Sequence, residues 1–158
     1  MELCLFKLNQ ADYGIPMSSV REVLSRPRLS PVPLAPATLR GMTHFRGEVL
    51  PVFSLDSLFN SSQTPPVTPV QDHSRVLVLT HSGQLLGLHV DQVDELSLPP
   101  GQSGDFWTQD SSELLGPLIP HLARHFQPLH IPGLFHTLQH SLSSIRLSFF
   151  QPTNPTPA

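Results

Sequence analysis

Proline is the residue that most restricts the folds open to this chain, because 18 of its 158 residues are proline and only 9 are glycine. Proline lacks a backbone N–H donor and breaks the interior of a helix, so prolines at this density fit a helical bundle poorly. They are typical of edge strands, strand ends and turns. Short apolar stretches lie between the turn signals, which favours a mostly β protein, a small barrel or sandwich. The length suggests one domain, or two small lobes that share a core.

Charge and cysteine content exclude several classes of protein. The net charge of −3 leaves no basic face for a phosphate backbone, so we expect no nucleic acid as partner. No apolar run reaches the roughly 18 residues of a membrane span. Glu2 stands where a signal peptide would carry basic residues, so neither membrane insertion nor secretion is expected. Cys4 has no second cysteine to pair with, and its apolar surroundings predict a buried thiol in a cytoplasmic protein.

Alternating apolar residues mark the strands expected near the N-terminus. Residues 3–8 and 13–17 are expected to pair as a hairpin across a polar turn. Residues 20–24 fit a helix or a strand by their spacing, and their valines together with the nearby Pro27 favour a strand. The choice between helix and strand at 20–24 stays open on the sequence alone.

The next segment begins with a connector rich in proline. Residues 27–36 hold four prolines and are expected to be extended. Residues 37–40 could then form one helical turn that ends at Gly41. Residues 48–55 are apolar on both alternating faces, as in a strand inside a core. Residues 55–59 allow a short helix.

A second pair of strands is expected in the middle of the chain. Residues 75–80 and 86–90 are apolar, and the turn residues 81–84 join them as a hairpin. The apolar pattern then changes phase, which predicts a bulge near Asp91. Before this pair, residues 60–74 are polar and rich in proline and are expected to form a flexible loop.

The C-terminal third gives mixed signals. Two sets of apolar residues have helical spacing, and prolines fragment the first set: Leu122, Phe126 and Leu129, and then Leu134, Leu138 and Leu142. Residues 149–158 have the composition of a disordered, proline-rich tail.

Four short motifs follow one another within residues 1–98. They are the hairpin segment YGIPMSSVREV, the connector PLAPATLRG, the strand RGEVLPV and the strand segment GLHVDQV. In this order and spacing they resemble the CheW family of bacterial chemotaxis adaptors. The chain departs from the family pattern at His44, Phe45 and Ser54, where the family carries asparagine, leucine and an acidic residue.

The resemblance implies both a fold and a function. The fold is mostly β, with two interlocked five-stranded SH3-like barrels and short helices, and a single CheW-like domain would cover residues 1–145. The implied function is a non-enzymatic chemotaxis-type adaptor, recruited from the cytoplasm to membrane receptor arrays. Its implied partners are the regulatory domain of a CheA-type histidine kinase and the cytoplasmic tip of a methyl-accepting chemoreceptor. No cofactor is implied.

The resemblance also implies a docking surface. Arg46 stands at the family's docking arginine, and its guanidinium fork can pair bidentately with a carboxylate. Gly47 would let the backbone turn sharply into the next strand. Val20, Glu22 and Val90 complete the expected partner-binding set. Packing between strands for Val20 and simple solvation for Glu22 remain equally plausible.

Three further residues are expected to act through the backbone. Gly41, Gly87 and Asp91 are predicted to be structural turn residues rather than partner contacts.

Nine histidines raise the alternative of a metal-binding β domain. His121 and His125 are four residues apart, as are His136 and His140, and on a helix each pair could ligate zinc. No glutamate follows His121 and no cysteine ligand accompanies either pair, so no metal site is expected.

Enzyme activity is not expected, because the chain has no Gly-x-Ser-x-Gly elbow, phosphate-binding glycine loop or paired carboxylates. Within the adaptor class, a chemosensory-like system that controls pili or gene expression is the alternative to chemotaxis.

Overall fold

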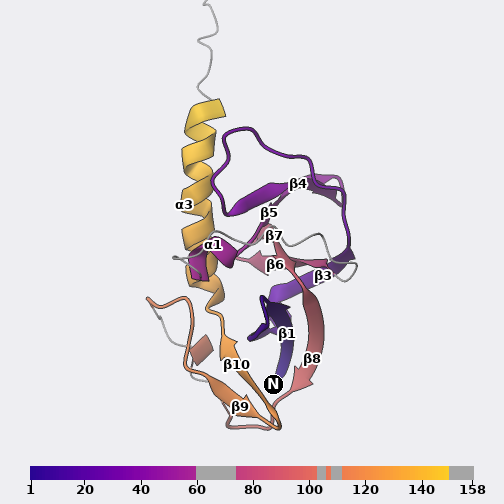
Figure 1. Ribbon diagram of the computed structural model, residues 1–158, viewed down its shortest axis with the longest axis vertical. Helices are drawn as coiled ribbons and strands as arrows, with labels where there is room; N and C mark the ends of the chain where they lie inside the picture. The colour runs from indigo at the N-terminus through magenta and orange to yellow at the C-terminus, as the bar shows by residue number, and fades with distance from the viewer. Residues whose placement is uncertain (60–73, 103–105, 108–111, 150–158) are drawn as a thin grey trace, which may run out of the picture.

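The computed structural model describes residues 1–59, 74–102, 106–107 and 112–149, and it contains two β-sheets flanked by one long helix (Figure 1). The first sheet has the order β8-β1-β2-β10-β9. Its strands are β1 (Glu2–Leu8), β2 (Ala11–Pro16), β8 (Gln92–Ser97), β9 (Ile119–His121) and β10 (Arg124–Pro128). The second sheet has the order β3-β6-β7-β5-β4. Its strands are β3 (Val20–Ser25), β4 (Leu39–Phe45), β5 (Glu48–Phe53), β6 (Arg75–His81) and β7 (Gln84–Val90).

The two sheets are interlocked by the path of the chain. β1 and β2 begin the first sheet, the five strands from β3 to β7 build the second, and β8 returns to pair with β1. The short 3-10 helix η1 (Met17–Ser19) makes the first crossing, and Asp91 alone makes the return between β7 and β8. The expected pair of interlocked five-stranded sheets is therefore confirmed.

Three hairpins turn in the same way, through two residues with positive φ. They are Asn9 and Gln10 between β1 and β2, Arg46 and Gly47 between β4 and β5, and Ser82 and Gly83 between β6 and β7. Two successive left-handed residues are the mark of a type I′ turn, whose twist matches that of the flanking strands. The expected turn at 81–84 is thus a two-residue turn, flanked by the paired residues His81 and Gln84.

Gly41 does not end a helical turn, contrary to the sequence-based prediction. It lies inside β4, and the proline-rich connector runs beside it with paired hydrogen bonds between Ser30 and Met42, both at 2.8 Å. A Cβ on Gly41 would lie 2.7 Å from the Ser30 carbonyl oxygen. Gly41 is therefore needed for this close approach, which the sequence did not show because the connector's path back along β4 depends on the tertiary fold.

Gly87 is not a turn residue either, because it lies in the middle of β7 with β5 on one side and β6 on the other. A Cβ there would lie 2.9 Å from Val52 Cγ2 and 3.0 Å from Val76 Cγ1. The reason for this glycine is tight packing inside the second sheet.

One apolar core joins the two sheets. Its members come from β1 and β2, from the strands of the second sheet, and from the helix α3 (Ile131–Phe149). Fully buried examples are Phe6 of β1, Phe53 of β5 and Leu134 of α3. Two smaller clusters lie elsewhere, one around Phe126 in the first sheet and one around Phe45 in the second. Cys4 is buried as expected, and its burial, with Glu95 and Asp94 nearby, raises the pKa of the thiol to about 11.

The helix α3 is longer than the short helices that the resemblance implied. Pro132 falls in its first turn, where a missing N–H costs no hydrogen bond. His130 precedes the helix, and its Nδ1 accepts a hydrogen bond from the Gly133 N–H at 3.2 Å. Ile131, Leu134, Phe135 and Leu138 then enter the shared core. In Figure 1 the helix runs beside the second sheet and ends above it.

The remaining local predictions have mixed outcomes. The first hairpin and the short helix α1 (Asp56–Phe59) are confirmed, and the choice left open at 20–24 is settled as the strand β3. The first helically spaced set in the C-terminal third, which prolines fragment, is not helical, because β9 and β10 occupy that segment. Most of the expected loop at 60–74, and the tail beyond 149, lie outside the described residues. Within the described part of the chain, no helix is long and apolar enough to cross a membrane.

We predict that Gly87→Ala lowers the free energy of unfolding by about 1–3 kcal/mol, because the added methyl group overpacks the sheet against Val52. Urea denaturation would measure the change. In a Val52→Ala background the same substitution should cost distinctly less, since the nearest methyl group is gone. Equal costs in both backgrounds would contradict the packing explanation.

Candidate functional site

The candidate site is built around the turn between β4 and β5. We use the name hairpin-tip surface for Arg46 and Gly47 of this turn together with Glu22 of β3 and Val49 of β5. Glu22 is partly exposed and the other three residues are exposed. The site therefore combines residues from one hairpin and from the edge strand β3 of the second sheet.

Arg46 is held in a defined direction by its own backbone and by two contacts. Its φ of 49° places it in the left-handed region, and Gly47 follows with a φ of 81°. The guanidinium carbon lies 5.3 Å from the centre of the Phe45 ring, within cation–π range. Nη2 lies 3.5 Å from Glu22 Oε2. The Arg46 side chain still exposes 66% of its surface, so most of the guanidinium faces solvent.

The contact between Arg46 and Glu22 also shows how the second sheet closes. β3 and β4 are its two edges, with three strands between them. An ion pair from β3 to the end of β4 requires the sheet to curl until these edges approach each other. Because both side chains are well exposed, the pair contributes at most about 1 kcal/mol to stability. It orients Arg46 more than it stabilises the fold.

An exposed apolar side chain lies close to this turn. Val49 of β5, two residues after Gly47, is 61% exposed. The sequence did not predict this exposure, since Val49 lies in a run that is apolar on both faces. Its exposure follows from its place opposite His44, which is itself exposed. A charged centre with an apolar neighbour suits protein recognition.

Gly47 is required by conformation rather than by space, since a Cβ there would meet no atom within 4 Å. Its positive φ explains the glycine, as expected for a sharp turn into β5.

Two other predicted partner-binding residues lie away from this surface. Val20 is half-buried and packs against the shared core. Val90 is completely buried at the end of β7. Val90 therefore cannot contact a partner in this conformation, and its predicted role is wrong. The burial of Val90 could not be predicted from the sequence. It depends on the apolar core that forms between the two sheets.

Asp91 is a turn residue, as predicted, and it joins the two sheets. Its backbone N–H donates to the Lys7 carbonyl at 2.9 Å, and its Oδ2 accepts from the Asn9 N–H at 3.0 Å. Asn9 Nδ2 also donates to Asp56 Oδ1 at 2.8 Å. The first hairpin turn is thereby fastened to two segments of the other lobe.

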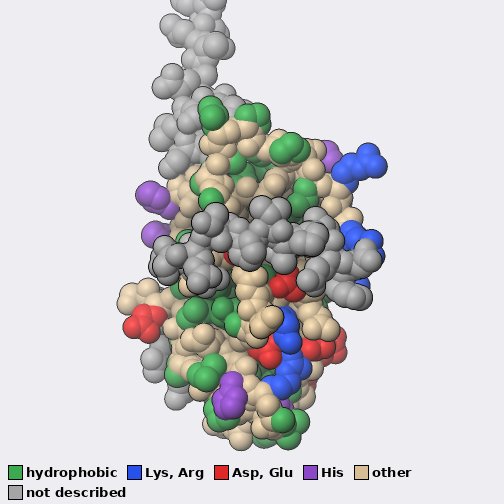
Figure 2. All heavy atoms as spheres, in the orientation of Figure 1, with side chains coloured by type: hydrophobic (Ala, Val, Ile, Leu, Met, Phe, Trp, Pro, Cys, Tyr) green, Lys and Arg blue, Asp and Glu red, His purple; other side chains and the backbone are tan. Residues whose placement is uncertain are grey.

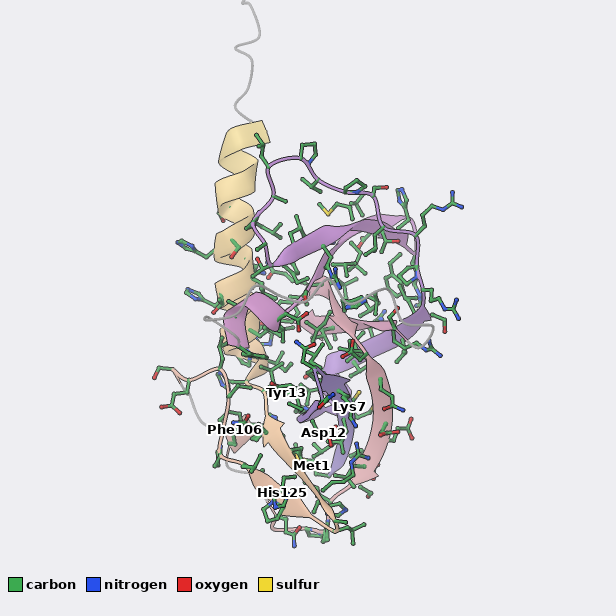
Figure 3. The ribbon with its side chains drawn as sticks, in the orientation of Figure 1. Met1, Lys7, Asp12, Tyr13, Phe106 and His125 are labelled. Carbon is green, nitrogen blue, oxygen red and sulfur yellow. The ribbon has the colours of Figure 1, made fainter. Side chains whose placement is uncertain are left out.

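A network of charges that the sequence did not reveal fastens β10. Arg124 donates to Asp12 Oδ2 at 3.2 Å and to Asp94 Oδ2 at 3.1 Å, and these hydrogen bonds raise the pKa of Arg124. Lys7 Nζ lies 4.0 Å from Asp12 Oδ1, and Figure 3 shows Lys7 and Asp12 together on the lower sheet. The network connects the four strands β1, β2, β8 and β10 and has a structural role.

The histidine pairs do not form a metal centre among the described residues. His121 ends β9 and His125 lies in β10, on the two arms of a hairpin rather than on a helix. His136 and His140 do share α3, and both are exposed. Over the described ranges, no three His, Cys, Asp or Glu side chains are grouped closely enough to hold an ion.

Comparison with known proteins gives consistent matches. The model of the CheW-like domain matches residues 2–103. The chain is 31% identical over 134 residues to Protein PilI of Pseudomonas aeruginosa, which covers 85% of this chain and 66% of PilI. It is 30% identical over 111 residues to Protein FrzA of Myxococcus xanthus, covering 66% of this chain and 67% of FrzA.

A further match is to the chemotaxis protein CheW of Treponema pallidum, with 25% identity over 92 residues, 58% of this chain and 54% of that protein. The chain thus spans between about half and two thirds of the length of these relatives. Among solved structures, the scaffolding protein TtCheW from Thermoanaerobacter tengcongensis superimposes with a TM-score of 0.63 at 21% identity. That match covers 82% of this chain and 88% of TtCheW, and it confirms the fold of two SH3-like lobes.

We predict that Arg46→Asn leaves the protein folded and stabilises it by up to about 1 kcal/mol, because asparagine tolerates the left-handed conformation better than arginine does. The loss of the exposed ion pair offsets part of this gain. Thermal unfolding of the two proteins side by side measures the difference. A clear drop in melting temperature would mean that the arginine is needed for the fold rather than for recognition.

Proposed function

The chain belongs to the family of CheW-like domains, and on that premise we propose that it is a non-enzymatic adaptor that couples chemoreceptors to a CheA-type histidine kinase. Its activity is stoichiometric binding of two partners. The observation that carries the proposal is the outward-facing Arg46, fixed at the tip of a rigid two-residue turn. An arginine in the left-handed conformation is unfavourable for the turn itself, which supports a role in recognition.

The hairpin-tip surface is the proposed site for the receptor. A carboxylate on the receptor tip pairs with the guanidinium of Arg46 and replaces Glu22, whose Oε2 lies 3.5 Å from Nη2. Val49 supplies apolar contact beside the turn. The exchange of one carboxylate for another keeps Arg46 paired in both states, and the released Glu22 carboxylate, on a side chain that is 41% exposed, is solvated by water.

The kinase regulatory domain is proposed to dock at the opposite end of the molecule. Leu122 lies in the turn of the β9–β10 hairpin and is 94% exposed, and Leu118, which directly precedes β9 at the other end of that strand, is 59% exposed. This hairpin lies at the lower end in Figure 1, whereas β4 lies near the upper end. Two partners can therefore bind at the same time. The shared core between the two surfaces gives them a physical connection, which is what coupling of two binding sites requires.

We predict a separation of the two binding activities by single substitutions. Arg46→Glu should weaken binding to a receptor cytoplasmic tip by about tenfold or more, because the new glutamate would repel the receptor carboxylate that pairs with Arg46. Leu122→Asp should weaken binding to the kinase regulatory domain and leave receptor binding unchanged. Calorimetric titration of each variant with each purified partner measures both effects.

Arg28→Glu is the matched control, since Arg28 is exposed on the connector and lies outside the hairpin-tip surface. It should retain both activities. Full receptor binding by a folded Arg46→Glu protein would contradict the assignment of the hairpin tip. Absence of binding to either partner by the unaltered protein would contradict the adaptor function as a whole.

An adaptor role in a system that controls pili is the second candidate. The match to PilI covers 85% of this chain, whereas the match to the CheW of Treponema pallidum covers 58%. A match over 85% of the chain must extend into its C-terminal third.

Deleting the gene in its host and scoring swimming and surface movement separately distinguishes the two systems. Loss of surface movement alone favours the pilus system, and loss of swimming alone favours chemotaxis. Restoration by the unaltered gene, but not by one encoding Arg46→Glu, links the defect to the hairpin-tip surface.

A further inference from the structure

A cavity of about 270 Å³ lies between the connector and the second sheet, apart from both proposed docking surfaces. Leu29 of the connector and Arg26, which precedes the connector, line it. Arg40 of β4, Arg75 of β6 and His89 of β7 line it as well, together with Ser74. Among the described residues, three arginines and one histidine thus line this space, and no acidic side chain does.

The charge of two of these arginines is not neutralised by a carboxylate. Arg75 Nη1 donates a hydrogen bond to the neutral carbonyl oxygen of Ser74 at 3.0 Å. Among the ion pairs of the described residues, neither Arg40 nor Arg75 takes part. An arginine without a carboxylate partner is common on an open surface. Two arginines that line the same cavity, however, repel each other. This repulsion is relieved when an anion lies between them.

The backbone is shaped to direct Arg40 to this place. The pairing of β4 with β5 shifts register between Leu39 and Gly41, so Arg40 is the extra residue of a β-bulge. A bulge commonly re-aims a side chain beside a functional site. The neighbouring Gly41 has no Cβ, so the connector can approach β4 closely. Ser30 of the connector and Met42 of β4 form two backbone hydrogen bonds there, each 2.8 Å long. These contacts hold the connector over the sheet and so form the second wall of the cavity.

His89 and Arg40 reach the cavity from two different strands. Both side chains line it, His89 from β7 and Arg40 from β4, and β5 lies between these two strands in the sheet. Burial of His89, and then the charge of Arg40, lower the pKa of the imidazole, while Asp91 and Asp56 act in the opposite direction. His89 is a half-buried donor at the edge of an arginine pair.

We propose that this cavity is a binding site for a small oxyanion, a carboxylate or a phosphate group, held by Arg40 and Arg75 with His89 beside them. The guanidinium fork matches both kinds of oxyanion. The volume of about 270 Å³ lies just below the range of drug-sized ligand sites, so it admits the anionic group and a short attached chain but not a nucleotide. In Figure 2, Lys and Arg side chains stand at the right-hand edge of the upper half, beside the ends of β3 and β4 (Figure 1).

The site has a predicted dependence on pH. An anion between the arginines offsets the charge of Arg40, so it raises the pKa of His89 from its lowered value. Binding is then coupled to uptake of a proton, and affinity rises as the pH falls through the pKa of His89 in the bound state. The groups that face His89 are Arg40 on β4, Arg75 on β6, Asp91 after β7 and Asp56 at α1.

Titration of the isotopically labelled protein with sodium sulfate or disodium succinate, followed by NMR, tests the site. Sulfate represents the phosphate class and stays fully charged between about pH 5 and 8, and succinate represents the carboxylates. We expect saturable shifts at residues 40, 75 and 89 that sodium chloride of equal ionic strength does not produce. Response to sulfate alone assigns a phosphate-type ligand, and response to succinate alone assigns a carboxylate.

Two substitutions make the test specific. Arg40→Gln should weaken binding about tenfold or more, because a charge-assisted hydrogen bond is lost from an exposed residue that the fold does not require. Arg28→Gln removes the same charge from the connector outside the cavity and should change affinity little. His89→Gln should abolish the rise in sulfate affinity between pH 8 and pH 5.5.

The proposal is overturned if neither anion produces saturable shifts in the cavity. It is also overturned if Arg28→Gln weakens binding as much as Arg40→Gln does, because the attraction would then belong to the general charge of the connector.

Discussion

The apolar core between the two sheets is the interaction on which the rest of the structure depends. Residues of β1, β2, most strands of the second sheet and α3 meet in it, so neither lobe completes its burial alone. The path of the chain follows from this core, because a chain that leaves the first sheet after β2 and returns at β8 places both sheets against the same side chains. Val90 illustrates the consequence, since it is buried at the point where the chain changes sheets. Polar contacts of the Asn9 turn with Asp91 and Asp56 then fix how the two lobes meet.

Both proposed sites of the second sheet arise where its regular pairing is interrupted. Arg46 stands in a left-handed turn, and Arg40 stands in a bulge. Regular strands alternate their side chains between two faces, so a side chain can be aimed elsewhere only at such an irregularity. The two arginines therefore lie on different surfaces although they are only six positions apart in the sequence. Arg46 is exposed at the turn where we propose a protein partner to bind, and Arg40 lines a cavity of small-molecule size.

Short-range patterns predicted much of the fold. The first hairpin, the pair of strands from 75 to 90 and the helix α1 all follow from alternation and turn residues. The exceptions have physical reasons. Gly41 and Gly87 resembled turn residues but permit close packing against segments that the tertiary fold brings beside them. The segment from 119 to 128 resembled a broken helix, yet its strands are fixed by pairing with β2 and by Arg124 with its two aspartates.

The sequence by itself determined the class of fold, the family and the place of Arg46 at a sharp turn, since these depend on neighbouring residues and on the order of motifs. Only the tertiary structure decided which side chains share a surface. It brought Glu22 to Arg46 by curling the second sheet, buried Val90, and gathered Arg40, Arg75 and His89 around one cavity. Each of these results depends on strand order and register, which are set by the burial of the whole core and are not encoded in any one segment.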